Sequence, residues 1–269
     1  MKIRVATYNI HKGISYRNHP RVHALKQAIG QFDADVVFLQ EVQGKHDRIA
    51  DKFGEESHGH RHWPTTAQPE FFAGDGRHAV YGMNAVYDHG HHGNALLSAF
   101  PIGTWTNQDI SDHAYEARGI LHCVVDTPAG PVHCYVVHLG LFEAGRTRQS
   151  QALIDAVLAS APAGEPVIIA GDFNDWRNTL GAKLRKALGV VEVFDELGSS
   201  SALGDMVRTL ARRKAALNPA RTFPSALPFF RLDRIYVRGF KVEAAQVLHG
   251  QEWARLSDHS PIVATLTLG

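Results

Sequence analysis

The chain has 269 residues, with 28 lysines and arginines against 27 aspartates and glutamates, 44% hydrophobic residues and two cysteines. This composition excludes a disulfide scaffold, a disordered protein and a coiled coil. No stretch approaches the ~18 consecutive apolar residues that a transmembrane helix needs, and the N-terminus lacks the apolar run of a signal peptide. We therefore expect a cytoplasmic protein with a single domain spanning residues 1–269.

The formal net charge of +1 argues against a dedicated nucleic-acid-binding protein, because such domains are usually strongly basic. One segment departs from this balance. Between residues 205 and 234 there are two acidic residues and seven basic ones: Arg208, Arg212, Arg213, Lys214, Arg221, Arg231 and Arg234. This segment is either a surface for a phosphate-bearing partner or the solvated flank of a helix.

Histidines are abundant, and eight of the 17 lie between His46 and His92. Their spacing lacks the His-Glu-x-x-His pattern of a zinc helix, and no pair of cysteines supports a zinc site. We expect a mobile loop rich in glycine and histidine beside the functional site.

Apolar patterning predicts alternating strands and helices along the whole chain. The predicted strands are residues 3–10, 35–40, 82–87, 94–98, 119–126, 132–139, 166–173, 232–237, 241–248 and 262–268. The predicted helices are residues 22–29, 143–159, 179–188 and a basic one at 203–217. The helix at 143–159 has two apolar pairs at helical spacing, Leu153 with Val157 and Ile154 with Leu158. Two successive halves of strands and helices predict an α/β fold in which two sheets pack together with helices outside.

Polar side chains recur where predicted strands end, and a rigid sheet can present such side chains to a substrate. They are Asn9, Glu41, His138, Asp172, Asn174, Asp233, Asp258 and His259. Each residue alone has an ordinary explanation as a helix cap, a turn residue or a hydrogen-bonded loop residue. Together, the carboxylate and amide oxygens suit a hard cation such as Mg²⁺, and the two imidazoles suit proton transfer.

The same residues resemble the motifs of the endonuclease/exonuclease/phosphatase superfamily of metal-dependent phosphoesterases, which includes DNase I-like nucleases, inositol phosphatases and sphingomyelinases. The matching segments are Thr-Tyr-Asn9, Gln-Glu41-Val, Asn94-Ala-Leu-Leu-Ser98, His138-Leu, Gly-Asp172-Phe-Asn174-Asp, Thr222-Phe-Pro, Leu-Asp233-Arg-Ile and Ser-Asp258-His259-Ser-Pro. They run from residue 7 to residue 261, whereas the stretch from Glu55 to His92 matches no motif. The C-terminal part is most similar to a small bacterial group associated with cardiolipin synthase genes.

The resemblance implies a four-layered α-β-β-α sandwich with the active site at one end of the two sheets. It implies that Glu41, Asn9 and Asp258 bind Mg²⁺ or Mn²⁺. It also implies that His259, oriented by Asp233, contacts the scissile phosphate or activates the attacking water. Asp172 and Asn174 would position that water and the phosphate, Asn9 would also contact the phosphate, and His138 would stabilise or protonate the leaving oxygen.

Arg118 is a further candidate phosphate ligand, because a guanidinium group matches phosphate oxygens better than an ammonium group does. The alternative is an exposed arginine at a strand end. If the hairpin of residues 119–139 closes with Asp126 opposite Gly130, Arg118 lies opposite His138, and Cys123 and Cys134 point to opposite faces. Closure with Asp126 opposite Pro131 reverses both statements.

The substrate is less well defined by the sequence than the reaction. The segment 222–230 is apolar and contains Phe229 and Phe230, so it is either a lipid-facing rim in peripheral contact with a membrane or ordinary packing beneath the sheets, which we favour. Trp176 is the tryptophan expected nearest the site, and a core or hinge position is favoured over a base-stacking role. We predict hydrolysis of phosphodiester bonds, with nucleic acid as substrate. The alternatives are a phospholipid or inositol phosphate as substrate, or a non-catalytic binding module with this fold.

Overall fold

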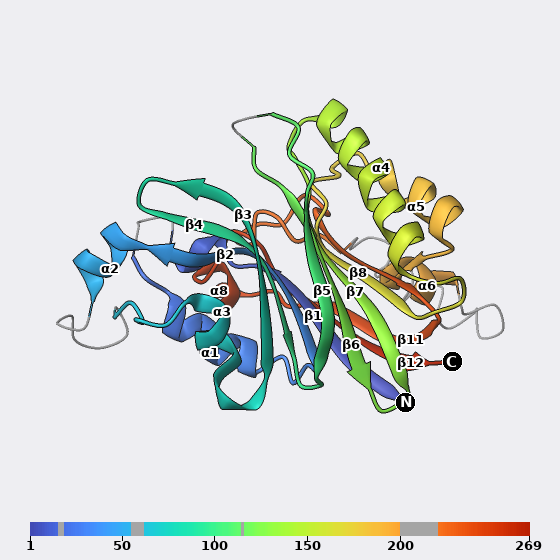
Figure 1. The fold of residues 1–269 in the computed structure, drawn as a ribbon, viewed down its shortest axis with the longest axis horizontal. Coiled ribbons are helices and arrows are strands. Elements are labelled where there is room, and N and C mark those ends of the chain that lie inside the picture. The colour runs from blue at the N-terminus through green and yellow to red at the C-terminus, as the bar shows by residue number, and fades with distance from the viewer. Residues whose placement is uncertain (16–18, 55–61, 114–115, 200–219) are drawn as a thin grey trace.

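The computed structural model describes residues 1–15, 19–54, 62–113, 116–199 and 220–269. Within these residues the strands form two six-stranded sheets that pack face to face, with helices on both outer surfaces (Figure 1). The predicted four-layered α/β sandwich is therefore confirmed. The basic helix predicted at 203–217 lies outside the described residues. In the part of the chain described, none of the helices combines the length and apolar character needed to cross a bilayer.

The first sheet has the strand order β11-β12-β1-β2-β4-β3. Its strands are β1 (Lys2–Asn9), β2 (Val36–His46), β3 (His78–Tyr87), β4 (Gly90–Ser98), β11 (Phe240–Val247) and β12 (Ile262–Leu268). β1 runs parallel to β2, and the other neighbours are antiparallel. β2 begins with the apolar run Val36–Leu39, as expected of a central strand covered on both faces, whereas β1 alternates charged and apolar residues from Lys2 to Val5.

The second sheet has the order β5-β6-β7-β8-β10-β9. Its strands are β5 (Ile102–Asp109), β6 (Gly119–Thr127), β7 (Gly130–His138), β8 (Val167–Asp172), β9 (Val191–Glu192) and β10 (Asp233–Arg238). β7 and β8 are parallel, and β10 is antiparallel to β8. The pattern did not predict β5, because four consecutive residues of this edge strand, Gly103–Thr106, are exposed and the apolar signal is lost.

Three apolar clusters fill the spaces between the layers. One lies between the sheets and includes Val5, Phe38, Leu121 and Ile168. The second lies on the outer face of the first sheet, beneath α1 (Val22–Gly30), α3 (Gln68–Ala73) and α8 (Gln251–Ala254). The third lies beneath α4 (Glu143–Ser160) and α5 (Leu180–Leu188) on the second sheet. The remaining short elements are α2 (Asp47–Phe53), α6 (Val193–Ser199), and the 3₁₀ turns η1 (His11–Gly13) and η2 (Gly74–Gly76).

Helix α4 confirms one of its two predicted apolar pairs. Leu153 and Val157 are buried, but Leu158 is 59% exposed. The buried face of α4 instead continues through polar residues, Arg146, Gln149 and Ser150, which contact the loop after β7 and helix α5.

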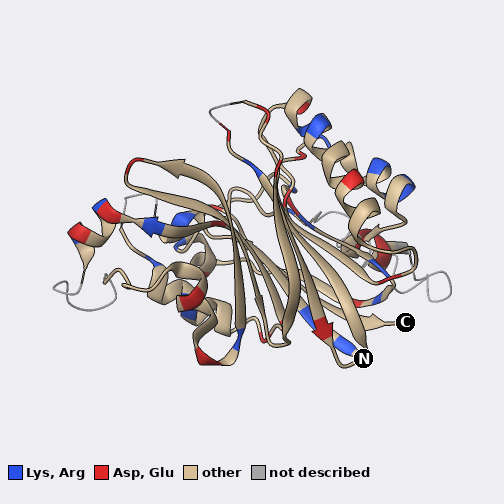
Figure 2. Ribbon diagram, viewed as in Figure 1, with Lys and Arg blue, Asp and Glu red and all other residues tan. Residues whose placement is uncertain are grey.

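Charged residues lie mostly on the helices and at the strand ends, as Figure 2 shows. The exceptions matter, because buried charges cost free energy unless they are paired or functional. Asp172 and Asp233 are both buried, and they lie at the edge of the second sheet where β8 ends and β10 begins.

Candidate active site

The second sheet places three predicted site residues in one row. His138 on β7 is the register partner of Asp172 on β8, and Asp172 is the register partner of Asp233 on β10. β7 and β8 end at the same edge because they are parallel, and β10 begins there because it is antiparallel. Residues nearly a hundred positions apart thus become neighbours through register alone.

One oxygen of the Asp172 carboxylate is the centre of the site. Asp172 Oδ2 accepts a hydrogen bond from Asn9 Nδ2 at 3.2 Å. It also lies 3.5 Å from His138 Nε2 and 3.6 Å from His259 Nε2. The other oxygen, Oδ1, accepts the backbone N–H of Asn174 at 3.0 Å. Burial raises the pKa of Asp172 to about 6, which brings this carboxylate close to the pKa that suits a general base near neutral pH.

His259 is held by Asp233, as the sequence predicted. The ring nitrogen Nδ1 lies 2.8 Å from Asp233 Oδ2, and both residues are buried. Burial alone lowers the pKa of His259, but the carboxylates of Asp233 and Asp172 outweigh it and raise the pKa to about 10. His259 therefore carries a positive charge at neutral pH, and Nδ1 donates its proton to Asp233.

His138 has the opposite electrostatic character. Burial, followed by the charge of Arg118 and then that of His259, lowers its pKa well below the ordinary range. His138 is thus neutral at pH 7, and the two histidines that flank Asp172 differ in charge. Pairs of titratable groups pushed in opposite directions are typical of acid–base sites.

Asn9 joins the two sheets at the site. Its Nδ2 donates to Asp172 of the second sheet and, at 3.4 Å, to Glu41 Oε1 of the first. Glu41 was predicted to end its strand, but β2 continues to His46 and Glu41 lies at a bulge, with a φ of 54°. A bulge re-aims a side chain without ending the strand. Asn174 also has a positive φ, 49°, and such strained residues gather at functional sites.

Asp258 and the residues around it close the site from the C-terminal side. Ser257 Oγ donates to the Asn9 carbonyl at 2.7 Å and accepts the N–H of His259 at 3.2 Å. Thr222 Oγ1 accepts the N–H of Asp233 at 3.2 Å. These two hydroxyls were not predicted as site residues, although both belong to the matching segments.

The site fits a divalent cation by the chemistry of its donors. In the part of the chain described, Asp172, Asp233 and His259 form a group whose possible ligand atoms all lie within 4.8 Å of one another. Asp233 Oδ1 is buried without a hydrogen-bond partner among the described residues. The oxygen set Glu41, Asn9 and Asp258 has the donor type that Mg²⁺ and Mn²⁺ prefer, and it stays a prediction as the ligand set.

Arg118 lies near His138 but not opposite it. Of the two closures that the sequence left open, the hairpin adopts the one with Asp126 opposite Pro131, so Cys123 pairs with Cys134 and Arg118 is not opposite His138. Thr127 and Gly130 flank the turn, where Gly130 has a φ of 114° that favours glycine. Both cysteines are free thiols.

The side chain of Arg118 is held by an acidic residue that the sequence did not single out. Glu116 Oε1 lies 3.5 Å from Arg118 Nη2 and accepts the N–H of Leu141 at 2.8 Å. Glu116 therefore ties Arg118 to the loop that follows His138. The Nε of Arg118 is buried without a hydrogen-bond partner among the described residues, so a donor remains for an anion.

The expected glycine- and histidine-rich loop is largely a hairpin. Residues 78–87 and 90–98 form β3 and β4, which contain His78, His91 and His92. The strands predicted at 82–87 and 94–98 are thus confirmed, and pairing between them extends them back to His78 and Gly90, through glycines and histidines that carry no apolar alternation. The part of this loop prediction that falls on residues 55–61 lies outside the described residues.

Two expectations about apolar residues near the site are also wrong. Phe229 and Phe230 are 56% and 41% exposed instead of packed beneath the sheets, and Trp176 is 43% exposed instead of buried in the core. Their side chains extend outward from the loops that carry the site.

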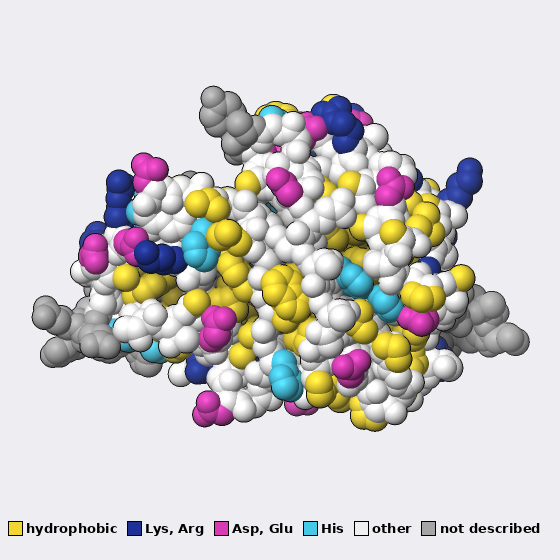
Figure 3. All heavy atoms as spheres, viewed as in Figure 1, with side chains coloured by type: hydrophobic (Ala, Val, Ile, Leu, Met, Phe, Trp, Pro, Cys, Tyr) yellow, Lys and Arg dark blue, Asp and Glu magenta, His cyan; other side chains and the backbone are white. Residues whose placement is uncertain are grey.

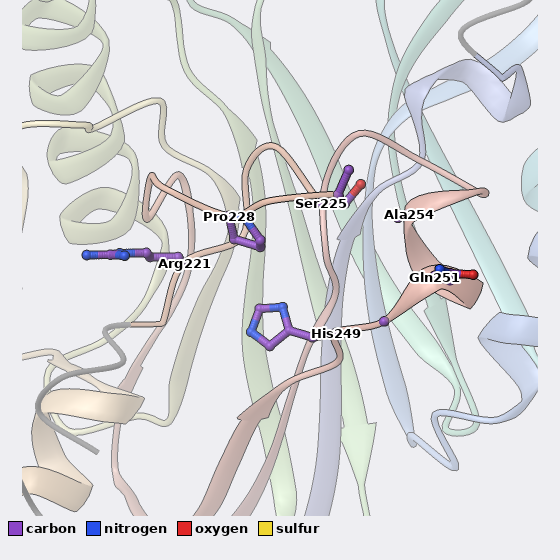
Figure 4. Close-up of a pocket in the computed structure, with 8 residues that line it drawn as sticks. Arg221, Ser225, Pro228, His249, Gln251 and Ala254 are labelled. Atoms are coloured by element: carbon purple, nitrogen blue, oxygen red, sulfur yellow. The ribbon is translucent and has the colours of Figure 1, made fainter. Parts of the chain in front are cut away.

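An open cavity of about 520 Å³ lies between the 222–230 segment and α8. In Figure 4 the His249 ring lies between Arg221 and Gln251 of α8, and the Arg221 side chain extends away from the other labelled residues. It contains none of the predicted catalytic residues, although Ser225 in its wall donates through Oγ to the carbonyl of Ser257 beside Asp258.

The family model that describes the endonuclease/exonuclease/phosphatase family matches residues 6–259. The chain belongs to this family. The match includes Asn9, Glu41, Asp172 and His259, so the family resemblance of the motifs is confirmed over almost the whole chain.

A curated relative is YbhP of Escherichia coli, which is 39% identical over 98% of this chain and 96% of its own length. Three solved structures share the family fold at lower identity. A family member from Bacteroides vulgatus has a TM-score of 0.72 at 16% identity, covering 100% of both chains. Danio rerio TDP2, complexed with a single-strand DNA product, has a TM-score of 0.68 at 18% identity, covering 99% of both. The mannosyl-6-phosphatase Bt3783 of Bacteroides thetaiotaomicron has a TM-score of 0.68 at 16% identity, covering 98% of this chain and 99% of its own.

Proposed function

We propose that the protein is a divalent-metal-dependent phosphoesterase that hydrolyses phosphodiester bonds at Asp172. The observation that carries the proposal is the convergence of Asn9, His138 and His259 on one oxygen of that carboxylate. A carboxylate with a purely structural role needs only one hydrogen-bond donor. A general base must also be oriented toward the attacking water and lie beside cationic groups that bind the phosphate.

The residues divide the work by charge. Asp172 accepts the proton of the attacking water. The backbone N–H of Asn174 donates a hydrogen bond to Asp172 Oδ1 and so orients the carboxylate. The side-chain Nδ2 of Asn174 donates a hydrogen bond to the Leu139 carbonyl at 2.8 Å. Asn174 is therefore a positioning residue. His259, charged and held by Asp233, faces the phosphate oxygens. His138 is neutral at pH 7 and keeps its ring proton, so it donates a hydrogen bond to the leaving oxygen, which takes its proton from solvent.

Glu41, Asn9 and Asp258 would hold Mg²⁺ or Mn²⁺. The cation supplies charge stabilisation of the phosphate that is worth several kcal/mol in enzymes of this type. A non-catalytic module remains the alternative, but it has no use for a buried Asp172–His259–Asp233 network whose members differ in charge.

The sequence motifs predict nucleic acid as the substrate. The similar protein TDP2 is complexed with a single-strand DNA product. The similar mannosyl-6-phosphatase acts on a phosphomonoester. These proteins support the reaction class more strongly than one substrate.

A panel of phosphate esters tests the proposal: bis(p-nitrophenyl) phosphate, duplex DNA, single-stranded DNA, RNA, a phospholipid and an inositol phosphate. Each is incubated with Mg²⁺, Mn²⁺ or EDTA. We expect turnover of at least one phosphodiester that stops in EDTA and resumes when metal is restored. Turnover that persists in EDTA, or none on any ester, would contradict the proposal.

A further inference from the structure

Three side chains with unused hydrogen-bonding capacity lie near His138, on the side of the site that the first sheet contributes. We call them the Lys12 cluster: Lys12 in the turn η1, His92 on β4, and Arg118 directly before β6. The Nδ1 of His92 and the Nε of Arg118 are buried without a hydrogen-bond partner among the described residues. A native fold leaves few buried polar atoms unpaired, so such atoms indicate a place for a ligand or an ordered water.

Strand β4 directs His92 toward the second sheet. Leu96 packs in the apolar cluster between the two sheets, and Asn94 Nδ2 donates to the carbonyl of Gly119 at 3.0 Å. Side chains two residues apart share one face of a strand, so His92 lies on this face as well. Since Gly119 directly follows Arg118, the two sheets bring His92 and Arg118 together.

The pairing of β4 is irregular on both sides next to His92. β2 has bulges on either side of its Val42–Gln43 pairing, and β3 has one between Met83 and Ala85. Bulges re-aim side chains and are common beside active sites. The ring of Tyr87 lies 5.8 Å from that of His92, centroid to centroid, and its hydroxyl accepts a hydrogen bond from Gln43 Nε2. The His92 ring is therefore held by packing, which leaves its Nδ1 uncommitted.

Lys12 is positioned through its backbone. His11 and Lys12 both have a positive φ, 46° and 59°, and residues in this conformation gather at functional sites. The buried side chain of Gln68 donates through Nε2 to the Lys12 carbonyl at 2.9 Å and accepts the N–H of Gln43 at 2.8 Å. Gln43 is the register partner of His92. Gln68 thus joins the turn that carries Lys12 to the strand pair that carries His92.

The cluster concentrates positive charge beside His138. Burial, followed by the charges of Lys12 and Arg118, lowers the pKa of His92 to about 4. After burial, the charges that lower the pKa of His138 include those of Arg118, His92 and Lys12. The Lys12 ammonium forms no ion pair with another described residue. A bound anion would offset this local charge.

Positive charge of this kind is not spread over the surface. On the face in Figure 3, the lysines and arginines of the described residues lie apart at the margins and form no broad basic patch. A long polyanion needs a track of cations. The Lys12 cluster instead offers two cations and one ring at a single point, which matches one compact dianion.

We propose that Lys12 and His92 bind a phosphate carried by the leaving group of the substrate. The inference rests on the proposed function, in which His138 donates a hydrogen bond to the leaving oxygen. It adds that the leaving oxygen bears a second phosphate, either directly, as in a diphosphate, or through a short carbon bridge. Lys12 binds this phosphate as a point charge, and Arg118, whose charge acts on both His92 and His138, contacts both phosphates.

Calorimetric titration of the metal-free protein tests binding separately from catalysis. The probes are orthophosphate, pyrophosphate and ethylene glycol bisphosphate. We expect at least one of the two-phosphate probes to bind roughly tenfold more tightly than orthophosphate, and to shift the NMR signals of the His92 ring. Preference for pyrophosphate would assign the second phosphate to the leaving oxygen itself. Preference for ethylene glycol bisphosphate would assign it to a phosphorylated alcohol.

Two variants on separate elements locate the binding. Lys12→Gln and His92→Gln should each weaken the preferred two-phosphate probe roughly tenfold, and Lys12→Arg, which keeps the charge, should retain most of the affinity. The matched control is Lys2→Gln, because Lys2 is exposed at the end of β1 opposite to Asn9. This control should bind like the wild-type protein.

Three results would overturn the inference: both two-phosphate probes bind no more tightly than orthophosphate, Lys12→Gln and His92→Gln bind them like the wild-type protein, or Lys2→Gln weakens them as much as Lys12→Gln. The last would reduce the effect to net charge. Hydrolysis of bis(p-nitrophenyl) phosphate by the wild-type protein is measured in parallel with Mg²⁺. Its absence would refute the proposed function and leave the binding result standing.

Discussion

Asp172 and Asp233 are directly opposed on neighbouring strands, and His259 bridges them, with Nδ1 2.8 Å from Asp233 and Nε2 3.6 Å from Asp172. Two buried carboxylates side by side repel each other and disfavour ionisation. The charge of His259 between them offsets this repulsion. Asp233 thus acts on the chemistry through the imidazole, while Asp172 keeps an oxygen directed at the other site residues.

Removal of the Glu41 carboxylate should weaken metal binding. Loss of a residue that only supports a metal ligand lowers metal affinity by roughly 10- to 100-fold. We expect Glu41→Gln, which alters a ligand itself, to lower the affinity for Mn²⁺ by at least as much. Electron paramagnetic resonance of Mn²⁺ titrations measures this directly. The control is Glu252→Gln, an exposed carboxylate on α8, and an unchanged Mn²⁺ affinity for Glu41→Gln would remove Glu41 from the metal site.

The row that contains His138 and Asp172 depends on a close approach of β7 and β8 at Gly171. Its φ is 149°, and a Cβ there would lie 1.9 Å from the Val137 carbonyl oxygen. Gly171→Ala should lower the free energy of unfolding by about 3 kcal/mol or more. Urea denaturation checks this against Gly30→Ala, where a Cβ meets no atom within 4 Å. Similar stabilities for the two variants would contradict the strand geometry.

Arg118 remains a predicted phosphate ligand, now oriented by Glu116. We expect Arg118→Gln to raise KM for a phosphodiester roughly tenfold, as loss of a charge-assisted hydrogen bond does. Because the charge of Arg118 contributes to lowering the pKa of His138, the same variant should raise that pKa in an NMR titration of the metal-free protein. Arg255→Gln, an exposed arginine on the C-terminal side of α8, is the control. No movement of the His138 signal would separate Arg118 from the site.

His122 should make stability depend on pH. Burial, followed by the charge of His133, lowers the pKa of His122 from 6.5 to about 4. The fold therefore holds it neutral, so its contribution is complete above pH 6.5 and is lost as pH falls toward 4. Allowing for solvent screening, about 1 to 2 kcal/mol of the free energy of unfolding is at stake.

The variant His122→Gln isolates this contribution from that of the other histidines. Its urea-unfolding free energy should fall less between pH 7.5 and pH 4 than that of the wild-type protein. Equal losses in the two proteins would show that His122 does not titrate in this range.

The polar residues of the site were predictable because apolar runs end in them. Val136 and Val137 lead into His138, and Val167 to Gly171 lead into Asp172, so the strand pattern itself marks the site. What brings them together is register, and the sequence did not determine the register of any strand pair. The β6–β7 hairpin allowed two closures that both preserve alternation, and the turn at Thr127 and Gly130 selects the one that displaces Arg118.

Backbone features and surface exposure were not predictable. Beyond the bulge at Glu41, β2 continues through mostly polar residues. No apolar pattern therefore indicated that the strand extends past Glu41. The run Pro228-Phe229-Phe230 has the same apolar sequence whether it faces the core or solvent. Its exposure becomes visible only in the structure, where Phe223 pairs with Phe230 and the side chains of Phe229 and Phe230 are exposed.

The most direct test of the account compares hydrolysis of bis(p-nitrophenyl) phosphate by the wild-type protein and by Asp172→Asn, in the same concentration of Mg²⁺. The substitution keeps the shape of the side chain and removes its charge and basicity. We predict a loss of kcat of ~10²-fold or more, with a thermal unfolding midpoint nearly unchanged. A wild-type kcat in Asp172→Asn would contradict the assignment of Asp172 as the centre of the active site.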